Sequence, residues 1–387
     1  MKRILDEHYL RRAIRLAMNG RGRVEPNPMV GCVIVKNDRV IGEGYHAHFG
    51  GPHAEPSALA NCTESPEGAT GYVTLEPCCH TNKKTPPCAP RVIAAKIARV
   101  VVGCLDPNPQ VNGNGVRMLR DAGIDVVGPM LEAEAKQLIA PFLARVTHHR
   151  PYVTLKWAES ANGLVAGRMG RPVRITNATS DRAVHALRAR CDAIAVGTNT
   201  VLNDDPLLTA RDVQTHRPLL RVVLSNTLKI TAQSRLVQTA REQPLLVFCS
   251  HESAAQHSER IGELKRAGAE VIALDTAGEG RFAFPDVLAE LHHRAVTHLL
   301  IEPGPTLARA LIEREQADRV WVIRSSKTIE DADGLPAAAV PYPAVGEVTL
   351  DGDRLTEYLN PASAVFFAPA ASADFVLTEE QSSPLKR

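Results

Sequence analysis

Three short segments near the N-terminus contain side chains that can bind a metal ion and move protons. They are His53-Ala54-Glu55, Glu76-Pro77-Cys78 and Thr85-Pro86-Pro87-Cys88. One imidazole and two thiolates can hold a zinc ion on three sides and leave a fourth position for water, which is the catalytic arrangement. The sequence therefore predicts His53, Cys78 and Cys88 as zinc ligands. Glu55, two residues after the histidine, is the predicted catalytic acid and base that acts on this water.

A structural zinc ribbon is the competing interpretation of these residues. Such a site has four protein ligands, usually in two close cysteine pairs, and the wide interval between Cys78 and Cys88 argues against it. Cys79 and His80 are rival ligands. Because Cys79 can bind the same ion as Cys78 only with strain, we interpret it as a packed or idle thiol.

The order His-x-Glu, Pro-Cys, Cys resembles the pattern of zinc-dependent deaminases that act on amino-heterocycles. In that chemistry an activated water attacks a ring carbon that carries an amino group. Glu55 is the obvious local base, and it would take the water proton and pass it to the ring nitrogen and then to the departing ammonia.

Composition favours small substrates. The 387 residues suggest two domains, the formal net charge is +2 and aromatic residues make up 4%. A nucleic-acid-binding protein usually has clustered basic residues with aromatic residues between them. The eight cysteines are scattered through apolar stretches, as reduced thiols are, and no apolar run has the length of a membrane span. We therefore expect a cytoplasmic protein whose partners include neither nucleic acid nor a membrane.

The segments around the predicted ligands alternate between helix and strand. We expect helices at 6–19, 53–62, from 88, at 115–122 and at 132–146, and strands at 30–35, 40–41, 72–75, 100–104 and 124–127, with a turn at Asn37-Asp38. The predicted metal ligands lie at the starts of two helices, where free N–H groups favour anionic ligands. This pattern predicts a three-layer α/β domain.

A polar break at 148–151 precedes a second α/β pattern. We expect strands at 152–156, 193–196, 219–224, 245–248, 271–274, 299–301 and 320–323, and helices at 183–189, 261–267, 287–291 and 307–312. The predicted organisation is a first domain at 1–147, a second at 151–370 and a frayed tail at 371–387.

The second half contains one candidate phosphate-binding turn. No Gly-x-Gly-x-x-Gly run follows a strand, so a Rossmann dinucleotide site is not supported. The segment Glu302-Pro303-Gly304-Pro305-Thr306 follows a strand and opens a helix, so free N–H groups would face an anion. An ordinary strand–helix turn is the alternative.

Motifs in both halves resemble the bifunctional deaminase–reductase family of riboflavin biosynthesis. They lie at 26–31, 53–55, 72–78, 85–88 and 106–109 in the first half, and at 151–156, 187–189, 192–197, 200–211 and 302–306 in the second. The long interval before Thr-Pro-Pro-Cys distinguishes this family from cytidine and tRNA-adenosine deaminases, which have Cys-x-x-Cys. The resemblance spans nearly the whole chain.

This resemblance implies a cytidine-deaminase-like domain followed by a dihydrofolate-reductase-like α/β domain. The first would remove the 2-amino group of a diaminopyrimidinone ribosylamine phosphate with the help of Zn²⁺, and the second would use NADPH to reduce the ribosyl group to ribityl. Matched positions imply cofactor contacts for Ala158, Arg174, Thr200, Asp204, Gly304, Pro305 and Thr306. They imply substrate contacts for Asn27, Arg188, Leu208, Arg211 and Glu302; guanidinium groups suit the substrate phosphate.

Several positions depart from the family pattern. In the first half, Cys79 replaces the usual serine in a loop that is one residue longer. In the second half, Asn162 replaces an aspartate, Pro172 a substrate-contacting serine and Arg174 a tryptophan, and the run at 323–330 is unrecognisable.

These departures keep other hypotheses open. One is a deaminase whose reductase-like domain is inactive or serves as a binding or assembly module. A deaminase for another heterocycle, such as guanine or a nucleoside, and a purely structural zinc protein are further alternatives. Both domains leave apolar faces that a second copy could cover, so we expect a homo-oligomer.

Overall fold

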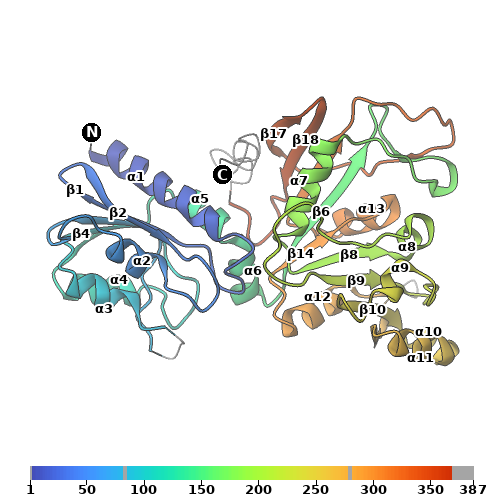
Figure 1. Ribbon diagram of the computed structural model, residues 1–387, viewed down its shortest axis with the longest axis horizontal. Helices are drawn as coiled ribbons and strands as arrows, with labels where there is room; N and C mark the ends of the chain where they lie inside the picture. Colours follow the sequence, from blue (N-terminus) through green and yellow to red (C-terminus); the bar gives the residue numbers. More distant parts are fainter. Residues whose placement is uncertain (1, 82–84, 278–280, 368–387) are drawn as a thin grey trace. The chain divides into compact units, whose positions relative to one another are not determined.

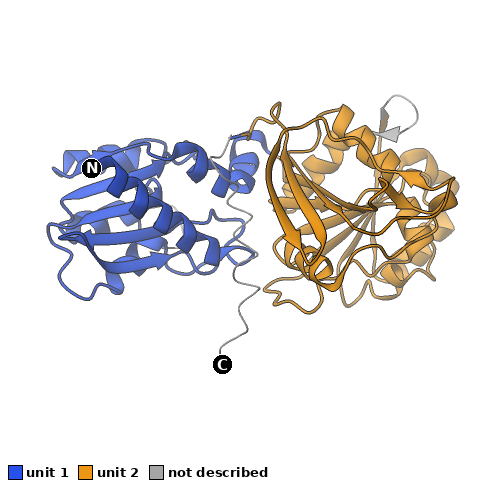
Figure 2. Cartoon of the chain, turned by 90° about the horizontal axis from the view of Figure 1, so that it is seen from above, with its two compact units in different colours: residues 1–149, 367–373 blue, residues 150–366, 374–387 orange. Residues whose placement is uncertain are grey.

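The computed structural model describes residues 2–81, 85–277 and 281–367. Of these, the residues up to His149 together with Phe367 form unit 1, and residues 150–366 form unit 2 (Figure 2). The predicted tail at 371–387 lies outside the described residues. No helix in the described ranges is long and apolar enough to cross a membrane.

Unit 1 is built on a mixed sheet with the strand order β2-β1-β3-β4-β5 (Figure 1). Its strands are β1 (Gly31–Lys36), β2 (Arg39–Tyr45), β3 (Thr70–Leu75), β4 (Arg99–Cys104) and β5 (Asp125–Val127). Its helices are α1 (Lys2–Ala17), η1 (Met18–Gly20), α2 (Ala54–Ala60), α3 (Cys88–Ala94), α4 (Asn114–Asp121), α5 (Glu132–Leu138) and α6 (Ala140–His148). The β1 strand pairs antiparallel with β2 and β3, whereas β3, β4 and β5 run parallel.

Alternating residues of β1 explain the predicted three layers. Val33 and Val35 pack in a cluster with Leu10 of α1, whereas Ile34 packs on the opposite face with Ala58 of α2. Because successive side chains of a strand point to opposite faces, a strand that is apolar throughout is buried on both sides. The three-layer prediction is confirmed.

Two predicted helices differ in the structure. The helix expected at 132–146 is two helices, α5 and α6, separated at Ile139. Pro141 lies in the first turn of α6, where its missing N–H is tolerated, but it cannot continue the hydrogen bonding of a preceding helix. His53 is the N-cap of α2 and lies outside it, with an extended backbone at φ −73° and ψ 174°.

Unit 2 is built on a larger mixed sheet with the order β11-β10-β9-β8-β14-β6-β15-β18-β17. Its strands are β6 (Tyr152–Glu159), β8 (Ala193–Gly197), β9 (Leu220–Leu224), β10 (Leu245–Ser250), β11 (Glu270–Leu274), β14 (His298–Ile301), β15 (Arg319–Arg324), β17 (Ala344–Leu350) and β18 (Asp353–Leu359). Two small antiparallel pairs join β7 (Leu164–Ala166) to β16 (Leu335–Pro336), and β12 (Thr276–Ala277) to β13 (Arg281–Phe282). The strands predicted at 193–196, 219–224, 245–248, 271–274, 299–301 and 320–323 are confirmed.

Helices cover both faces of this sheet. They are η2 (Arg168–Gly170), α7 (Ala178–Arg188), α8 (Thr198–Asp204), α9 (Arg235–Gln238), α10 (His251–Gln256), α11 (Ser258–Arg266), α12 (Phe284–His293) and α13 (Pro305–Glu313). Val287 of α12 and Leu311 of α13 pack on one face, and Leu187 of α7 and Leu264 of α11 on the other. Because helices cover both faces of the sheet, we expect a ligand to bind at the carboxyl ends of its parallel strands.

Candidate active sites

The three predicted metal ligands of unit 1 lie close together. His53 Nδ1 is 3.6 Å from Cys78 Sγ and 3.4 Å from Cys88 Sγ. Zinc bonds of ordinary length in tetrahedral geometry would separate a nitrogen and a sulfur ligand by about 3.5 Å. Because the three ligand atoms all lie within 4.8 Å of one another, the donor set fits a zinc ion.

Three different elements hold these ligands. His53 precedes α2, and its carbonyl accepts a hydrogen bond from Ser57 Oγ at 2.7 Å. Cys78 follows the carboxyl end of β3, and Cys88 opens α3. The Cys88 N–H lies 3.0 Å from the Cys78 carbonyl and 3.4 Å from the Cys78 sulfur, so the two cysteines are fixed against each other.

Glu55 lies beside the ligands in the first turn of α2, with only 4% of its surface exposed. Burial, helped by the negative charge of Cys78, raises the pKa of Glu55 to about 7 in the metal-free protein. A zinc ion would add positive charge and lower this pKa again. A buried carboxyl group beside the clustered ligands is placed to accept and release protons there.

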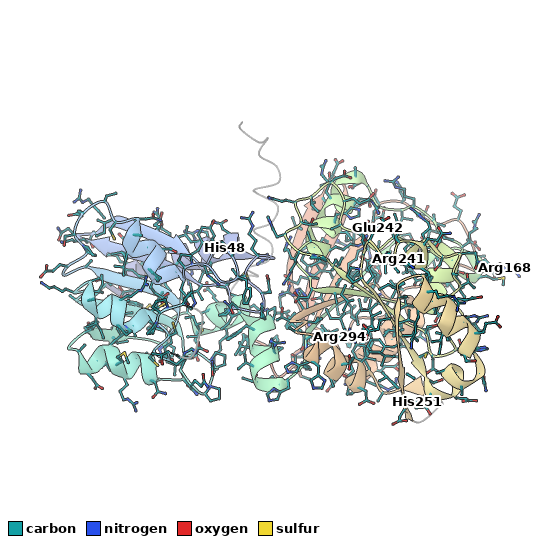
Figure 3. The ribbon with its side chains drawn as sticks, turned by 60° about the horizontal axis from the view of Figure 1, so that its bottom comes forward. His48, Arg168, Arg241, Glu242, His251 and Arg294 are labelled. Carbon is teal, nitrogen blue, oxygen red and sulfur yellow. The ribbon has the colours of Figure 1, made fainter. Side chains whose placement is uncertain are left out.

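A cavity of about 340 Å³ opens in front of these residues. The side chains and glycines that line it include Asn27, His46, Phe49, Gly51, His53, Glu55, Glu76, Cys78, His80, Thr85, Asp106 and Asn108. Asn27 Nδ2 is 3.2 Å from His46 Nε2, and His46 Nδ1 is 2.9 Å from the Pro52 carbonyl. The predicted substrate residue Asn27 is therefore held at the cavity wall. His48, labelled in Figure 3, directly precedes Phe49 in the segment between β2 and α2, and Phe49 and Gly51 line the cavity.

Glu76 anchors the loop that closes another side of this cavity. Its buried carboxylate accepts hydrogen bonds from the N–H groups of Asp106 (3.2 Å), Gly113 (2.8 Å) and Val116 (2.9 Å). Gly115 permits this approach, because a Cβ there would lie 2.0 Å from the Pro77 carbonyl oxygen. Glu76 thus holds the loop that brings Asp106 to the cavity, a role that its place in the sequence did not predict.

The structure separates Cys79 from the metal site. Its sulfur is 3.9 Å from the Gln110 carbonyl, and it lines a different surface depression with Arg117 and Asp121. His80, the other rival ligand, lines the cavity but is not one of the three clustered ligands.

Unit 2 contains a cavity of about 790 Å³ at the carboxyl ends of its parallel strands. Among the residues that line it are eight of the predicted site residues: Ala158, Arg174, Thr200, Asp204, Glu302, Gly304, Pro305 and Thr306. Gly304 is the N-cap of α13, and a Cβ there would meet nothing within 4 Å. The first turn of α13 is therefore open to an anionic group. Cavity size and these groups fit a dinucleotide cofactor.

An ion pair joins two predicted substrate residues beside this cavity. Arg188 Nε donates to Glu302 Oε1 at 2.7 Å, and Arg188 Nη2 donates to Glu302 Oε2 at 2.7 Å. Arg188 Nη1 also donates to the Thr209 carbonyl at 3.0 Å. Burial opposes the charge of Glu302, but Arg188 and Lys156 prevail and lower its pKa to about 2.

The other two predicted substrate residues lie elsewhere. Leu208 is 2% exposed and packs in the core, with a left-handed backbone at φ 53°, so its side chain does not face the cavity. Arg211 is exposed and contacts Thr209 Oγ1 and His185 Nδ1 through its guanidinium and its N–H. Neither residue lines the cavity of the described structure.

The comparisons with known proteins agree with this geometry. Residues 3–104 match the family "Cytidine and deoxycytidylate deaminase zinc-binding region", and residues 151–334 match "RibD C-terminal domain". Riboflavin biosynthesis protein RibD of Aquifex aeolicus is 36% identical over 95% of this chain and 99% of that protein. The Escherichia coli protein of that name is 39% identical over 85% of this chain and 90% of its own length. The chain belongs to the RibD family.

Solved structures show the same two-part fold. The diaminohydroxyphosphoribosylaminopyrimidine deaminase/5-amino-6-(5-phosphoribosylamino)uracil reductase of Thermotoga maritima has a TM-score of 0.79 and 33% identity, over 93% of this chain and 99% of that one. RibD of Acinetobacter baumannii has a TM-score of 0.77 and 30% identity over the same shares. The predicted fold class is confirmed. This RibD-family chain is a bifunctional riboflavin-biosynthesis enzyme with deaminase and reductase activities that uses zinc and NADPH.

Lys156 is a site residue that the sequence analysis did not single out. In the β6–β14 pairing Ile301, the last residue of β14, lies opposite Leu155, so Glu302 just beyond β14 lies beside Lys156 in the middle of β6. Burial lowers the pKa of Lys156, and the Glu302 carboxylate opposes this shift. In the sequence, the only indication of such a role was that Lys156 is the one charged residue of the predicted strand at 152–156.

The departures of this RibD-family chain in unit 2 are neighbours in space. The Asn162 amide bonds both backbone groups of Ile329: its Oδ1 accepts from the N–H at 3.1 Å and its Nδ2 donates to the carbonyl at 3.0 Å. Ser325 Oγ donates to the carbonyl of Ile175 at 2.7 Å, next to Arg174. Hydrogen bonds therefore join the altered segments to one another.

Proposed function

We propose that His53, Cys78 and Cys88 hold the zinc ion and that Glu55 transfers protons in the deamination. When bound, zinc lowers the pKa of a water molecule and so makes it nucleophilic near neutral pH. Glu55 accepts a proton from this water and delivers it to the pyrimidine ring nitrogen, and it then moves the second proton, from the added hydroxyl group, to the departing amino group. The overall change is the addition of water and the loss of ammonia.

The substrate in this proposal is 2,5-diamino-6-ribosylamino-4(3H)-pyrimidinone 5′-phosphate. Asn27 and the Asp106 loop would orient its ring in the cavity of unit 1. Family membership establishes the two activities, and the triangle of ligand atoms beside the buried Glu55 supports this assignment of residues.

In unit 2 we assign the cofactor to the wall formed by Ala158, Thr200, Asp204, Arg174 and the turn Gly304–Thr306. NADPH, when bound, supplies the hydride that converts the ribosyl to the ribityl group. Lys156, Arg188 and Glu302 would hold the deaminated substrate at the strand ends. Leu208 and Arg211 would contact it only through backbone or after movement of an exposed side chain.

A deaminase with an inactive reductase-like domain is not favoured. The match to the RibD C-terminal domain covers 151–334, and the altered segments hydrogen-bond to one another. We also propose a division into 1–147, 151–370 and 371–387, a homo-oligomeric enzyme, a cytoplasmic location and no nucleic-acid partner.

Replacement of Glu55 by Gln tests the acid–base assignment. The variant should keep its zinc and its fold, because Glu55 is not among the clustered ligands, yet lose deaminase activity. General acid–base catalysis is commonly worth about a hundred- to ten-thousand-fold. Since Glu55 transfers protons more than once, we expect a loss at the upper end of this range. A variant with more than about a tenth of the wild-type rate would refute the assignment.

A further inference from the structure

Thr85 contacts the ring nitrogen of His53 that faces away from the cysteines. Thr85 Oγ1 lies 3.2 Å from His53 Nε2, whereas Nδ1 of the same ring faces the two sulfurs at 3.6 Å and 3.4 Å. Both imidazole nitrogens therefore have a partner. The segment between Cys78 and Cys88, which provides two of the predicted ligands, also provides this hydroxyl.

We propose that Thr85 is a positioning residue for the zinc ligand His53; this inference rests on the zinc site proposed above. A neutral imidazole carries its proton on one nitrogen and offers the lone pair of the other to a metal. If the Nε2–H donates to Thr85 Oγ1, the lone pair is on Nδ1 and points at the sulfurs. Outer hydrogen bonds of this kind fix the ring orientation of metal-ligating histidines.

The sequence Thr85-Pro86-Pro87-Cys88 gives this contact its rigidity. A residue before proline is restricted to an extended backbone, and each proline ring fixes its own φ. Pro87 has φ −62° and ψ 147° and is the N-cap of α3, which Cys88 opens. Thr85 Oγ1 and Cys88 Sγ are thus held by one stiff segment and reach His53 at its two different nitrogens.

The hydroxyl is a neutral partner. Metal-ligating histidines donate their second N–H to a carboxylate, a backbone carbonyl or water. A threonine hydroxyl orients the ring without adding a negative charge to a site that already has two thiolates and Glu55. Thr85 therefore orients His53, and the Glu55 carboxylate is left to transfer protons.

Zinc affinity of the full-length protein, measured by competition with a chromophoric chelator, tests this role. Thr85→Val removes the hydroxyl and should weaken zinc binding by about ten- to a hundred-fold. Thr85→Ser should restore binding to near the wild-type value. Thr63→Val is the matched control, because the Thr63 hydroxyl bonds the Ile41 carbonyl in the same unit, outside the residues that line the cavity; it should leave the affinity unchanged.

Nitrogen-15 NMR of the zinc-loaded wild-type protein gives an independent readout that needs no variant to fold. We expect the His53 proton on Nε2 and the metal on Nδ1. A proton on Nδ1, or a Thr85→Val protein that binds zinc as tightly as wild type, would overturn the proposal. Equal weakening by Val and Ser would overturn it too, because it would point to packing of the methyl group. If Cys88→Ser keeps its zinc, the metal site itself is wrong and Thr85 loses its role with it.

Discussion

Arg188 and Glu302 form a two-point ion pair that joins helix α7 to the end of strand β14, with both nitrogen–oxygen distances at 2.7 Å. The side chains are only 12% and 17% exposed, so neither charge is well solvated by itself. Lys156, in the middle of the neighbouring strand β6, adds a second cation. This pair therefore connects the stability of unit 2 to the place where a substrate would bind.

Glu302→Gln should destabilise unit 2 and abolish its reductase activity. The change leaves Arg188 and Lys156 without their carboxylate, and breaking a buried pair in this way costs roughly 3–5 kcal/mol. Both tryptophans, Trp157 and Trp321, are buried in unit 2, so fluorescence-detected urea unfolding reports on this unit. Glu290→Gln removes a more exposed partner of Arg294 and should cost at most about 1 kcal/mol. If the two changes lower the free energy of unfolding by the same amount, the Glu302 pair stabilises unit 2 no more than an exposed ion pair does.

Acid should weaken this contribution in a defined pH window. Because the pKa of Glu302 falls from 4.5 to about 2 on folding, its ionisation stabilises the folded state fully above pH 4.5. The stabilisation declines as the pH falls from about 5 toward 2. Urea unfolding of wild type and Glu302→Gln should therefore differ by a constant amount between pH 7 and pH 5 and converge below. A difference that grows on acidification would contradict the assigned pKa.

The cysteines of unit 1 should differ in their effect on zinc. Cys78→Ser and Cys88→Ser should lose the metal, since each removes one of three protein ligands. Cys79→Ser should retain it, because that sulfur lies against the Gln110 carbonyl at 3.9 Å. Elemental analysis of the purified variants decides the matter. Zinc loss from the Cys79 variant with retention in the Cys88 variant would reverse the ligand assignment.

Arg174 should bind NADPH through charge. Its side chain is 80% exposed and pairs with Asp181 at 2.9 Å, so the guanidinium can reach a phosphate at the cavity wall. Arg174→Trp should weaken NADPH binding at low salt and much less at about 1 M salt, where charges are screened beyond about 3 Å. Calorimetry at both salt concentrations measures this. Arg182→Trp, on helix α7 next to Asp181 and outside the residues that line the cavity, is the control; a salt-independent effect of Arg174→Trp would refute a charge contact.

The sequence pointed to the three side chains that the structure brings together in unit 1. Zinc ligands come from a few side-chain types, so the sequence could predict His53, Cys78 and Cys88, and apolar periodicity predicted the helices and strands around them. The β17–β18 hairpin was missed because its apolar pattern is weak: two of the buried positions of β18 are the acidic residues Asp353 and Glu357. Such a strand is stabilised by its neighbours in the sheet more than by its own composition.

Register explains what the sequence could not show in unit 2. Lys156 and Glu302 are far apart along the chain and become neighbours only because Leu155 pairs with Ile301. Likewise, the amide of Asn162 finds Ile329 across the fold, which makes two separate departures from the family pattern compatible. No local pattern reports such pairings. The break between α5 and α6 at Ile139, in contrast, could have been predicted from the local sequence, because Pro141 cannot continue a preceding helix.

Product analysis with the full-length enzyme tests the bifunctional assignment most directly. The diaminopyrimidinone ribosylamine phosphate is incubated with zinc-loaded protein, with and without NADPH, and the products are separated by mass. Without NADPH we predict release of ammonia and accumulation of the deaminated ribosylamino compound. With NADPH we predict the ribityl compound and one NADPH oxidised for each molecule formed. Accumulation of the deaminated compound with NADPH left unchanged would contradict the reductase, and recovery of unchanged substrate in both incubations would contradict the deaminase.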